Sequence, residues 1–298
     1  MKNIILNNKY ELPLIGYGSA IVSDYKGGIK PLLRKCNDLI RNKRQFKLNM
    51  GTSSCLKELS KLGYQMIDTS SAYNASEKVI GESLIKQNRK NIKIITKLCN
   101  TDQRTGDVEK ALEKSLIQLR TDYVDVYLMH WPVTDIYLEN WKKMESLYKK
   151  GLCKAIGVCN CNQHHLEAIM EIAEIKPMVN QFECHPLFTQ DELRKYCKEK
   201  DIQVMAYTPT ARMDERLKKT VIVKLAQKYN KSMAQIMLRW HIQIGNIPIV
   251  NTINKKHLAD NIDIFDFELL SEEVEAITAI NINSRLRYDP DNCDFNQL

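Results

Sequence analysis

Short apolar runs alternate with amphipathic segments along most of the chain. The runs that read as strands are 12–19, 65–70, 92–99, 124–131, 155–160, 178–184, 203–209 and 247–252. The segments with one apolar face at helical spacing are 53–63, 76–86, 108–119, 138–150, 164–174, 191–200 and 220–230. Apolar strands of this kind between helices are typical of a parallel sheet that is buried on both faces.

Eight strands, seven of them followed by a helical segment, favour a closed (β/α)8 TIM barrel over an open doubly wound sheet. Residues 4–13 precede the first barrel strand and predict a β-hairpin with Asn7 and Asn8 at its turn. No linker or shift in composition divides the chain. We therefore expect one domain over residues 1–298.

One unit is irregular, because a basic insertion at 21–50 follows the first barrel strand. It holds eight Lys and Arg against Asp24 and Asp38, a net charge of +6, and only 32–42 has helical periodicity. Long loops after barrel strands lie at the catalytic face. The insertion is either a lid that attracts an anionic substrate or a solvated helix face, and we favour the second interpretation.

Composition narrows the function classes. The chain is 44% hydrophobic and 27% charged, and no apolar run reaches the length of a membrane-spanning helix. The polar N-terminus predicts a cytoplasmic protein without a signal peptide, and nine cysteines without a CxxC pair predict reduced thiols and no metal site. Most of the net charge of +8 comes from the insertion. We therefore expect a monomer that binds neither nucleic acid nor membrane.

Four titratable side chains fall at the ends of consecutive predicted strands. Asp68 and Tyr73 follow the second barrel strand, Lys97 lies near the end of the third, and His130 ends the fourth. These strand ends meet at one rim of a barrel. Asp68 is expected to pair with Lys97, and Lys97 to lower the pKa of Tyr73 from its usual value near 10. Tyr73 would then serve as a general acid, while neutral His130 orients a carbonyl oxygen.

Each of these residues is weak evidence for catalysis by itself. An Asp at a strand end is more often structural, and a His-Trp pair at a strand end often serves only in packing. The four residues in this order are much harder to attribute to chance. The sequence also contains, in this order, the motifs YQMIDTSSAYNASEKVIGESL, IITKL, VDVYLMHWP, KAIGVCNCN, VNQFECHP and YTP. Together, and almost from end to end, they resemble the aldo-keto reductase family in its compact bacterial form.

The resemblance implies reduction of an aldehyde or ketone to an alcohol, with Asp68, Tyr73, Lys97 and His130 as the catalytic tetrad. It also implies a nicotinamide cofactor that lies extended across the barrel rim, and the chain indeed has no GxGxxG motif. Cys159 stands where the family usually has serine. The residues that the resemblance assigns to the cofactor are Gly18, Ser19, Asp68, Cys159, Asn160, Gln181, Tyr207, Thr208, Thr210, Arg212, Asn251, Thr252, His257 and Asn261.

Within that set, Asn160 and Gln181 would hold the carboxamide, Tyr207 would stack on the nicotinamide, and the loop with Arg212 would meet the pyrophosphate. The segment 247–261 departs from the family pattern. The usual Lys and Arg that grip the 2′-phosphate of NADP are replaced by Asn251 and His257. Lys255 and Lys256 are the available substitutes. NADP(H) is favoured over NAD(H) by a narrow margin.

The substrate pocket is expected to contain Ala20, Cys99, His130 and Trp131. Ala20 and Cys99 are small where the family often has aromatic residues, which predicts a wider pocket on that side. The tail 283–295 resembles the ends of bacterial members, so Arg285, Arg287 and Tyr288 are candidate rim residues, and roles in the core or in solvent stay open as the alternative.

Two rival functions stay open at this point. The first is a sensor or regulatory subunit that binds the cofactor with little turnover, as some relatives do in channels, and the intact tetrad argues against it. The second is a phosphate-binding TIM-barrel enzyme of other chemistry. It is disfavoured because no glycine-rich loop marks the seventh and eighth strands.

Overall fold

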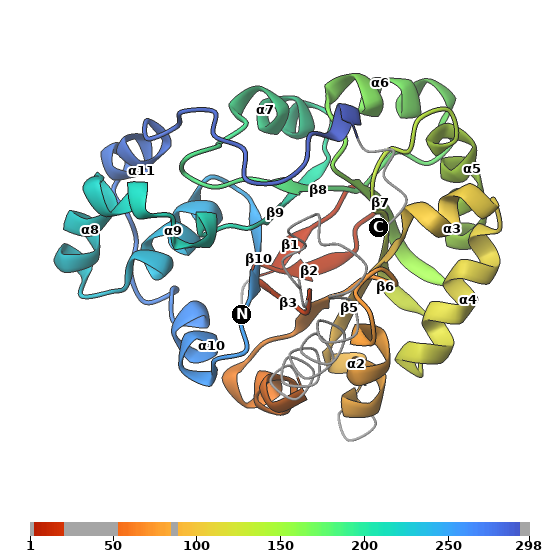
Figure 1. Ribbon diagram of the computed structural model, residues 1–298, viewed down its shortest axis with the longest axis horizontal. Helices are drawn as coiled ribbons and strands as arrows, with labels where there is room; N and C mark the ends of the chain where they lie inside the picture. The colour runs from red at the N-terminus through yellow and green to blue at the C-terminus, as the bar shows by residue number, and fades with distance from the viewer. Residues whose placement is uncertain (1–2, 21–52, 85–88, 293–298) are drawn as a thin grey trace, which may run out of the picture.

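The computed structural model describes residues 3–20, 53–84 and 89–292. Eight parallel strands close into a barrel in the order β10-β3-β4-β5-β6-β7-β8-β9, and helices surround it (Figure 1). The predicted TIM barrel is therefore confirmed. Its strands are β3 (Gly16–Gly18), β4 (Met66–Asp68), β5 (Lys93–Leu98), β6 (Val124–Met129), β7 (Cys153–Cys159), β8 (Val179–Glu183), β9 (Gln203–Tyr207) and β10 (Ile247–Asn251).

The α-helices include several that the sequence pattern did not reveal. Residues 53–62 are helical, and the labelled helices are α2 (Ser76–Leu84), α3 (Asn100–Thr105), α4 (Val108–Leu119), α5 (Tyr137–Lys149), α6 (Gln163–Ile172), α7 (Asp191–Glu199), α8 (Val221–Tyr229), α9 (Met233–Gln243), α10 (Lys255–Ile262) and α11 (Ser271–Thr278). Short 3-10 turns are η2 (Arg89–Asn91), η3 (Ala211–Met213), η4 (Glu215–Lys219) and η5 (Pro290–Asn292). Sequence reasoning missed α3, α9, α10 and α11.

The physical reason differs among these missed helices. Helices α3, α10 and α11 have only six to eight residues, too few for a periodic pattern to stand out. Helix α9 buries residues around most of its circumference, including Met237, Leu238 and Trp240, so it lacks a broad polar face. The basic insertion 21–50 lies outside the described residues. None of the helices in the described part of the chain combines the length and apolar character needed to cross a membrane.

The predicted N-terminal hairpin is present and lies at the N-terminal end of the barrel. Strand β1 (Asn3–Ile5) pairs antiparallel with β2 (Glu11–Pro13), and the turn contains Asn7 and Asn8. The Asn7 amide donates to the carbonyl of Pro177 at 3.2 Å and the Asn8 amide to that of Lys154 at 2.9 Å. The hairpin thus binds to segments at the starts of β7 and β8, which leaves the opposite rim for the site.

Helix α2 holds the Tyr73 loop in place through two residues of the same sequence motif. Glu77 is buried and its carboxylate accepts a hydrogen bond of 2.5 Å from the Thr96 hydroxyl on β5. Gly81 faces α4 so closely that an added Cβ would lie 2.2 Å from the carbonyl oxygen of Gln118. Both residues are therefore needed to dock α2 against the barrel and α4.

Replacing Gly81 by Ala should destabilise the fold. The methyl group would collide with the backbone of α4, and overpacking of this kind outweighs the gain of about 1 kcal/mol in helix propensity. We expect the free energy of unfolding to fall by about 2–3 kcal/mol in urea titration. Lys78→Ala, at an exposed position of the same helix, is the control and should change it by no more than about 0.5 kcal/mol. Equal stability of the two variants would contradict the proposed close contact.

Candidate active site

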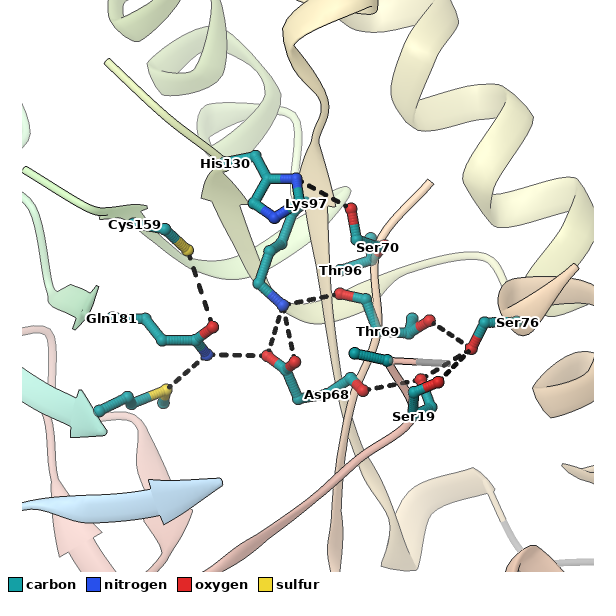
Figure 2. Close-up of polar contacts among 12 residues, drawn as sticks. Ser19, Asp68, Thr69, Ser70, Ser76, Thr96, Lys97, His130, Cys159 and Gln181 are labelled. Atoms are coloured by element: carbon teal, nitrogen blue, oxygen red, sulfur yellow. Dashed lines mark hydrogen bonds and ion pairs between the residues drawn. The ribbon is translucent and has the colours of Figure 1, made fainter. Parts of the chain in front are cut away.

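A buried ion pair forms the floor of the site. The ammonium of Lys97 on β5 lies 2.7 Å from both carboxylate oxygens of Asp68 on β4 and donates to the carbonyl of Thr69 at 2.9 Å. The Gln181 amide on β8 donates to the same carboxylate at 2.8 Å (Figure 2). Lys97 is 1% exposed and Asp68 3%. The expected pair is present, and its additional hydrogen bonds make two buried charges tolerable.

Tyr73 follows in the loop between β4 and α2, and its ionisation differs from the sequence prediction. Its ring centroid lies 5.2 Å from the Lys97 ammonium. We expected a lowered pKa, yet burial raises the pKa of Tyr73, and this exceeds the lowering by Lys97. Burial is the largest influence, and the Asp68 carboxylate, 2.7 Å from the ammonium, also raises the pKa of Tyr73. Lys97 itself stays protonated, because Asp68 and Tyr73 together outweigh its burial and raise its pKa.

His130 completes the group from the end of β6. Its ring stands edge-on to that of Tyr73, with centroids 5.6 Å apart and an interplanar angle of 78°. Burial, followed by the charges of Lys97 and Arg287, holds the pKa of His130 well below its ordinary value of 6.5. The imidazole is therefore neutral at physiological pH.

Ser70 contacts Nδ1 of His130, and the tautomer of the imidazole decides which of the two groups donates. The Ser70 hydroxyl accepts a hydrogen bond from the Ala72 backbone N–H at 3.1 Å and lies 3.3 Å from Nδ1 of His130 (Figure 2). If the hydroxyl donates its proton to Nδ1, neutral His130 carries its own proton on Nε2. His130 would then present an N–H donor on the ring edge opposite Ser70.

The residues expected around the nicotinamide lie together on adjacent strands. The Asn160 amide donates to the carbonyl of His130 at 3.0 Å, and its oxygen accepts from the Tyr207 hydroxyl at 2.7 Å. The thiol of Cys159 lies 3.9 Å from Oε1 of Gln181, which is a weak contact. Asn160 and Gln181 thus supply amide groups, and Tyr207 a partly exposed ring, which are the groups that bind and stack on a planar carboxamide-bearing ring.

Two other residues of the predicted cofactor set, Gly18 and Ser19, are buried, and Ser19 forms its hydrogen bonds within the protein. Gly18 is the last residue of β3 and is buried. The buried Ser19 hydroxyl donates to the carbonyl of Asp68 at 2.9 Å and accepts from Ser76 at 2.7 Å (Figure 2). These bonds tie β3, β4 and the start of α2 together.

The segment after β9 has an unusual backbone. Thr208, Ala211, Arg212 and Met213 all have positive φ angles, between 47° and 55°. Left-handed backbone is unfavourable for residues other than glycine, and such strained turns are often found at ligand sites. Ala211 is fully buried and anchors the turn, Thr210 is partly buried, and Arg212 is exposed. The position at the end of β9 agrees with a role in contacting a ligand at the rim.

The segment expected to bind the adenosine end of the cofactor is largely exposed. Asn251 donates to the carbonyl of Ala20, and the Thr252 hydroxyl accepts from the backbone N–H of Asn254 at 3.0 Å. His257 is exposed, while Asn261 is 9% exposed.

Lys255 and Lys256, the substitute cations, each pair with an acid in exposed contacts. Lys255 pairs with Glu58 at 3.3 Å and Lys256 with Asp260 at 3.5 Å. Such exposed ion pairs contribute little to stability.

The residues predicted to line the substrate pocket are less exposed to solvent than expected. Trp131 is 4% exposed and its carbonyl accepts from the Gln103 amide at 3.0 Å. Cys99 is 8% exposed, and its thiol donates to Asp102 at 3.1 Å. The missed helix α3 begins at the next residue and supplies Asp102, which explains why Cys99 is covered. Ala20 is partly exposed.

Sequence reasoning missed two residues that shape this site, Ser70 and Glu183. Ser70 lies two residues after Asp68, within the motif that was already singled out. Glu183 is a fully buried acid in the apolar run of β8, and a carboxylate in such a strand must have partners. Glu183 shares this requirement with Asp68.

Comparisons with known proteins point to one family. A model of the Aldo/keto reductase family matches residues 41–282. Glyoxal reductase of Bacillus subtilis (strain 168) is 43% identical over 253 residues, which are 84% of this chain and 91% of that protein. Methylglyoxal reductase DkgA of Escherichia coli (strain K12) is 38% identical over 243 residues, 80% of this chain and 87% of that protein.

Among solved structures, an aldo-keto reductase of Bombyx mori in complex with NADP superposes with a TM-score of 0.84 at 30% identity. The match covers 99% of this chain and 98% of the other. The family match spans most of the chain, and the relatives agree with it in fold as well as in sequence. The chain therefore belongs to the aldo/keto reductase family and is an NAD(P)H-dependent oxidoreductase that reduces carbonyl compounds.

Proposed function

We propose that the protein reduces small reactive aldehydes and ketones, with Tyr73 as general acid and His130 as the group that orients the carbonyl. The main support is the edge-on arrangement of the Tyr73 and His130 rings, 5.6 Å apart, over the Lys97–Asp68 pair. The glyoxal and methylglyoxal reductases among the relatives suggest dicarbonyls as first substrates.

The cofactor, when bound, supplies a hydride to the carbonyl carbon. Asn160, Gln181 and Tyr207 would hold its nicotinamide end. The carbonyl oxygen gains negative charge as the hydride arrives. The His130 Nε2–H and the Tyr73 hydroxyl are the two donors available to stabilise that charge, and Tyr73 gives up its proton to form the alcohol.

Lys97 contributes when Tyr73 loses its proton. In the resting site the pKa of Tyr73 is raised by burial, so the acid is protonated at neutral pH. As phenolate character develops, the ammonium at 5.2 Å from the ring stabilises it, and Asp68 keeps that ammonium in place. The same pair therefore serves both to satisfy buried charge and to assist proton transfer.

The direct test is oxidation of NADPH by the purified protein in the presence of glyoxal or methylglyoxal. The reaction is monitored through the loss of absorbance of the reduced nicotinamide. Turnover within the usual enzymatic range of about 1–10³ s⁻¹ is expected. Cofactor binding without turnover of any aldehyde or ketone would instead indicate a sensor or regulatory role.

We propose NADPH as the preferred cofactor. Lys255 and Lys256 lie at the start of α10, where the helix dipole also favours a phosphate. We expect NADPH to bind about 10-fold more tightly than NADH in fluorescence titration, equivalent to roughly 1.4 kcal/mol. The double variant Lys255→Ala with Lys256→Ala should reduce this ratio to about two or less.

The control for that titration is Lys142→Ala, an exposed lysine on α5, which should leave the ratio unchanged. A wild-type ratio near one would contradict the proposed preference. A ratio that is unaffected by the double variant would assign the discrimination to other residues.

A further inference from the structure

The turn 208–213, between β9 and η4, holds four residues in backbone conformations that favour glycine. Thr208 has a φ angle of 53°, and Ala211, Arg212 and Met213 have φ angles of 47°, 52° and 55°. Thr208 also precedes Pro209, and the residue before a proline is normally extended. Its left-handed backbone is therefore unfavourable for two reasons. A turn built in this way persists only where the surrounding structure fixes it.

A buried histidine of α9 fixes this turn. His241 is 0% exposed, and its Nε2 lies 3.0 Å from the carbonyl oxygen of Pro209. Because a carbonyl can only accept, Nε2 carries the proton and donates it. Proline has no backbone N–H, so the carbonyl is the one backbone polar group that Pro209 offers. Helix α9 packs on β10, which pairs with β9 (Figure 1). His241 thus contacts the turn from a helix that is docked on the barrel.

The other ring nitrogen of His241 also has a partner. Its Nδ1 lies 3.3 Å from the amide nitrogen of Asn246, which can only donate. Asn246 is 3% exposed, and its amide also donates to Sγ of Cys184 at 3.5 Å. A donor at Nδ1 and an acceptor at Nε2 together require a neutral ring. Burial agrees with this, because it lowers the pKa of His241 to about 3. Both the orientation and the tautomer of the ring therefore direct the N–H group to Pro209.

The turn lies where the cofactor is expected to cross the rim. It directly follows Tyr207, whose hydroxyl donates to the Asn160 side chain at 2.7 Å. Thr210 is partly buried and Arg212 is exposed. A hydroxyl and a guanidinium are donors that suit the oxygens of a pyrophosphate. His241 is completely buried behind the turn, so it can influence a ligand only through the position of the turn.

We propose that His241 is a positioning residue that holds the turn 208–213 in its cofactor-binding conformation before the cofactor arrives. This inference rests on the proposed function, because it takes the nicotinamide end of the cofactor to lie at Tyr207. Without the anchor, part of the binding free energy has to order strained backbone. If only a fraction of the molecules has the competent turn, the apparent Kd rises by the inverse of that fraction.

The experiment compares the binding of NADPH with that of adenosine 2′-monophosphate by calorimetry. The monophosphate has the adenosine end of the cofactor and lacks the pyrophosphate and the nicotinamide, so it does not extend to the turn. The variant His241→Phe removes both hydrogen bonds and keeps a ring of similar size. Its Kd for NADPH should rise about 10-fold, as for a competent fraction of about one tenth, while its Kd for the monophosphate changes by less than about two-fold.

The conservative variant His241→Gln has an amide N–H for Pro209 and an amide oxygen for Asn246, and should restore most of the affinity for NADPH. The main effect of His241→Phe should fall on Kd for NADPH, with a much smaller effect on kcat at saturating NADPH. An unchanged Kd in His241→Phe, or an equal rise for NADPH and for the monophosphate, would overturn the proposal.

Leu238→Ala, on the same helix, is the control for general loss of stability. Leu238 is 0% exposed, and its truncation leaves a cavity in the core. Its Tm should fall at least as far as that of His241→Phe, while its Kd for NADPH stays within about two-fold of the wild-type value. If Leu238→Ala weakens NADPH binding as much as His241→Phe does, the effect is one of stability and the proposal is wrong.

Hydrogen exchange of the cofactor-free wild type tests the turn even if a variant does not fold. The N–H groups of Ala211, Met213 and Asp214 donate to carbonyls within the turn at 2.8–3.0 Å. They should exchange at least about 10-fold more slowly than in an unstructured peptide. Protection that appears only after NADPH is added would overturn the proposal. Neither this measurement nor the titration needs turnover, so absence of turnover with any aldehyde or ketone would count against the proposed function alone.

Discussion

Replacing Tyr73 by Phe should lower kcat for aldehyde reduction by about 10²–10⁴-fold, because it deletes the proton that the developing alkoxide takes up. The ring and its contact with His130 remain, so the affinity for NADPH should stay the same within about two-fold. Stopped-flow measurement of hydride transfer, together with fluorescence titration of the cofactor, checks both statements.

The matched control is Tyr64→Phe. It removes the same atom from a tyrosine whose hydroxyl donates to the carbonyl of Leu258 at 3.0 Å, away from the tetrad. That variant should lose about 1 kcal/mol of stability and keep its kcat. If Tyr73→Phe retains more than a tenth of wild-type kcat, another residue is the acid.

The pH profile gives a second readout for Tyr73. Burial raises its pKa above the ordinary value of 10.0, so the tyrosine is protonated below that pH. If Tyr73 is the acid, kcat for reduction should stay level from about pH 6 to about pH 9 and fall only at higher pH. A fall in kcat near pH 7 would assign the proton to a different group.

Replacing Lys97 by Met should cost both stability and activity. It leaves the Asp68 carboxylate, 3% exposed, without its cation, and breaking a buried pair in this way typically costs 3–5 kcal/mol. We therefore expect the free energy of unfolding to fall by about 3–5 kcal/mol in urea titration, and kcat to fall at least about 10²-fold.

The double variant Lys97→Met with Asp68→Leu separates the two effects. It removes both charges and replaces them with apolar groups of similar volume, which is often neutral for stability. We expect it to recover most of the lost stability while turnover stays low. Recovery of turnover in the double variant would show that the pair acts only as a structural element, and unrecovered stability would show that Gln181 and Thr69 need these charges.

The success of sequence reasoning on the barrel has a simple physical basis. Parallel strands buried on both faces must be apolar runs, and each must be followed by a helix with one apolar face. Strand ends such as Asp68, Lys97 and His130 could be placed at one rim because closure of the barrel brings consecutive strands together. The missed helices were those in which shortness (α3, α10 and α11) or near-complete burial (α9) obscures a periodic pattern.

The same reasoning gave a wrong direction for the pKa of Tyr73. The prediction counted the positive charge of Lys97 and left out the burial of Tyr73, which is the larger influence on its pKa. The balance among burial, an ammonium and a carboxylate depends on distances, and no sequence pattern contains them. Only the folded structure shows that burial of Tyr73 outweighs the charge of Lys97, and that Asp68, 2.7 Å from the ammonium, acts in the same direction as burial.

By itself, then, the sequence determined the barrel and the rim at which Asp68, Tyr73, Lys97 and His130 lie, because these follow from local periodicity and from the order of strand ends. The tertiary structure alone decided the contact of Ser70 with Nδ1 of His130 and the contact of His241 with the carbonyl of Pro209. Ser70 and His130 are 60 residues apart, and Pro209 and His241 are 32 residues apart. Contacts over such separations arise when the barrel closes and its helices dock on it.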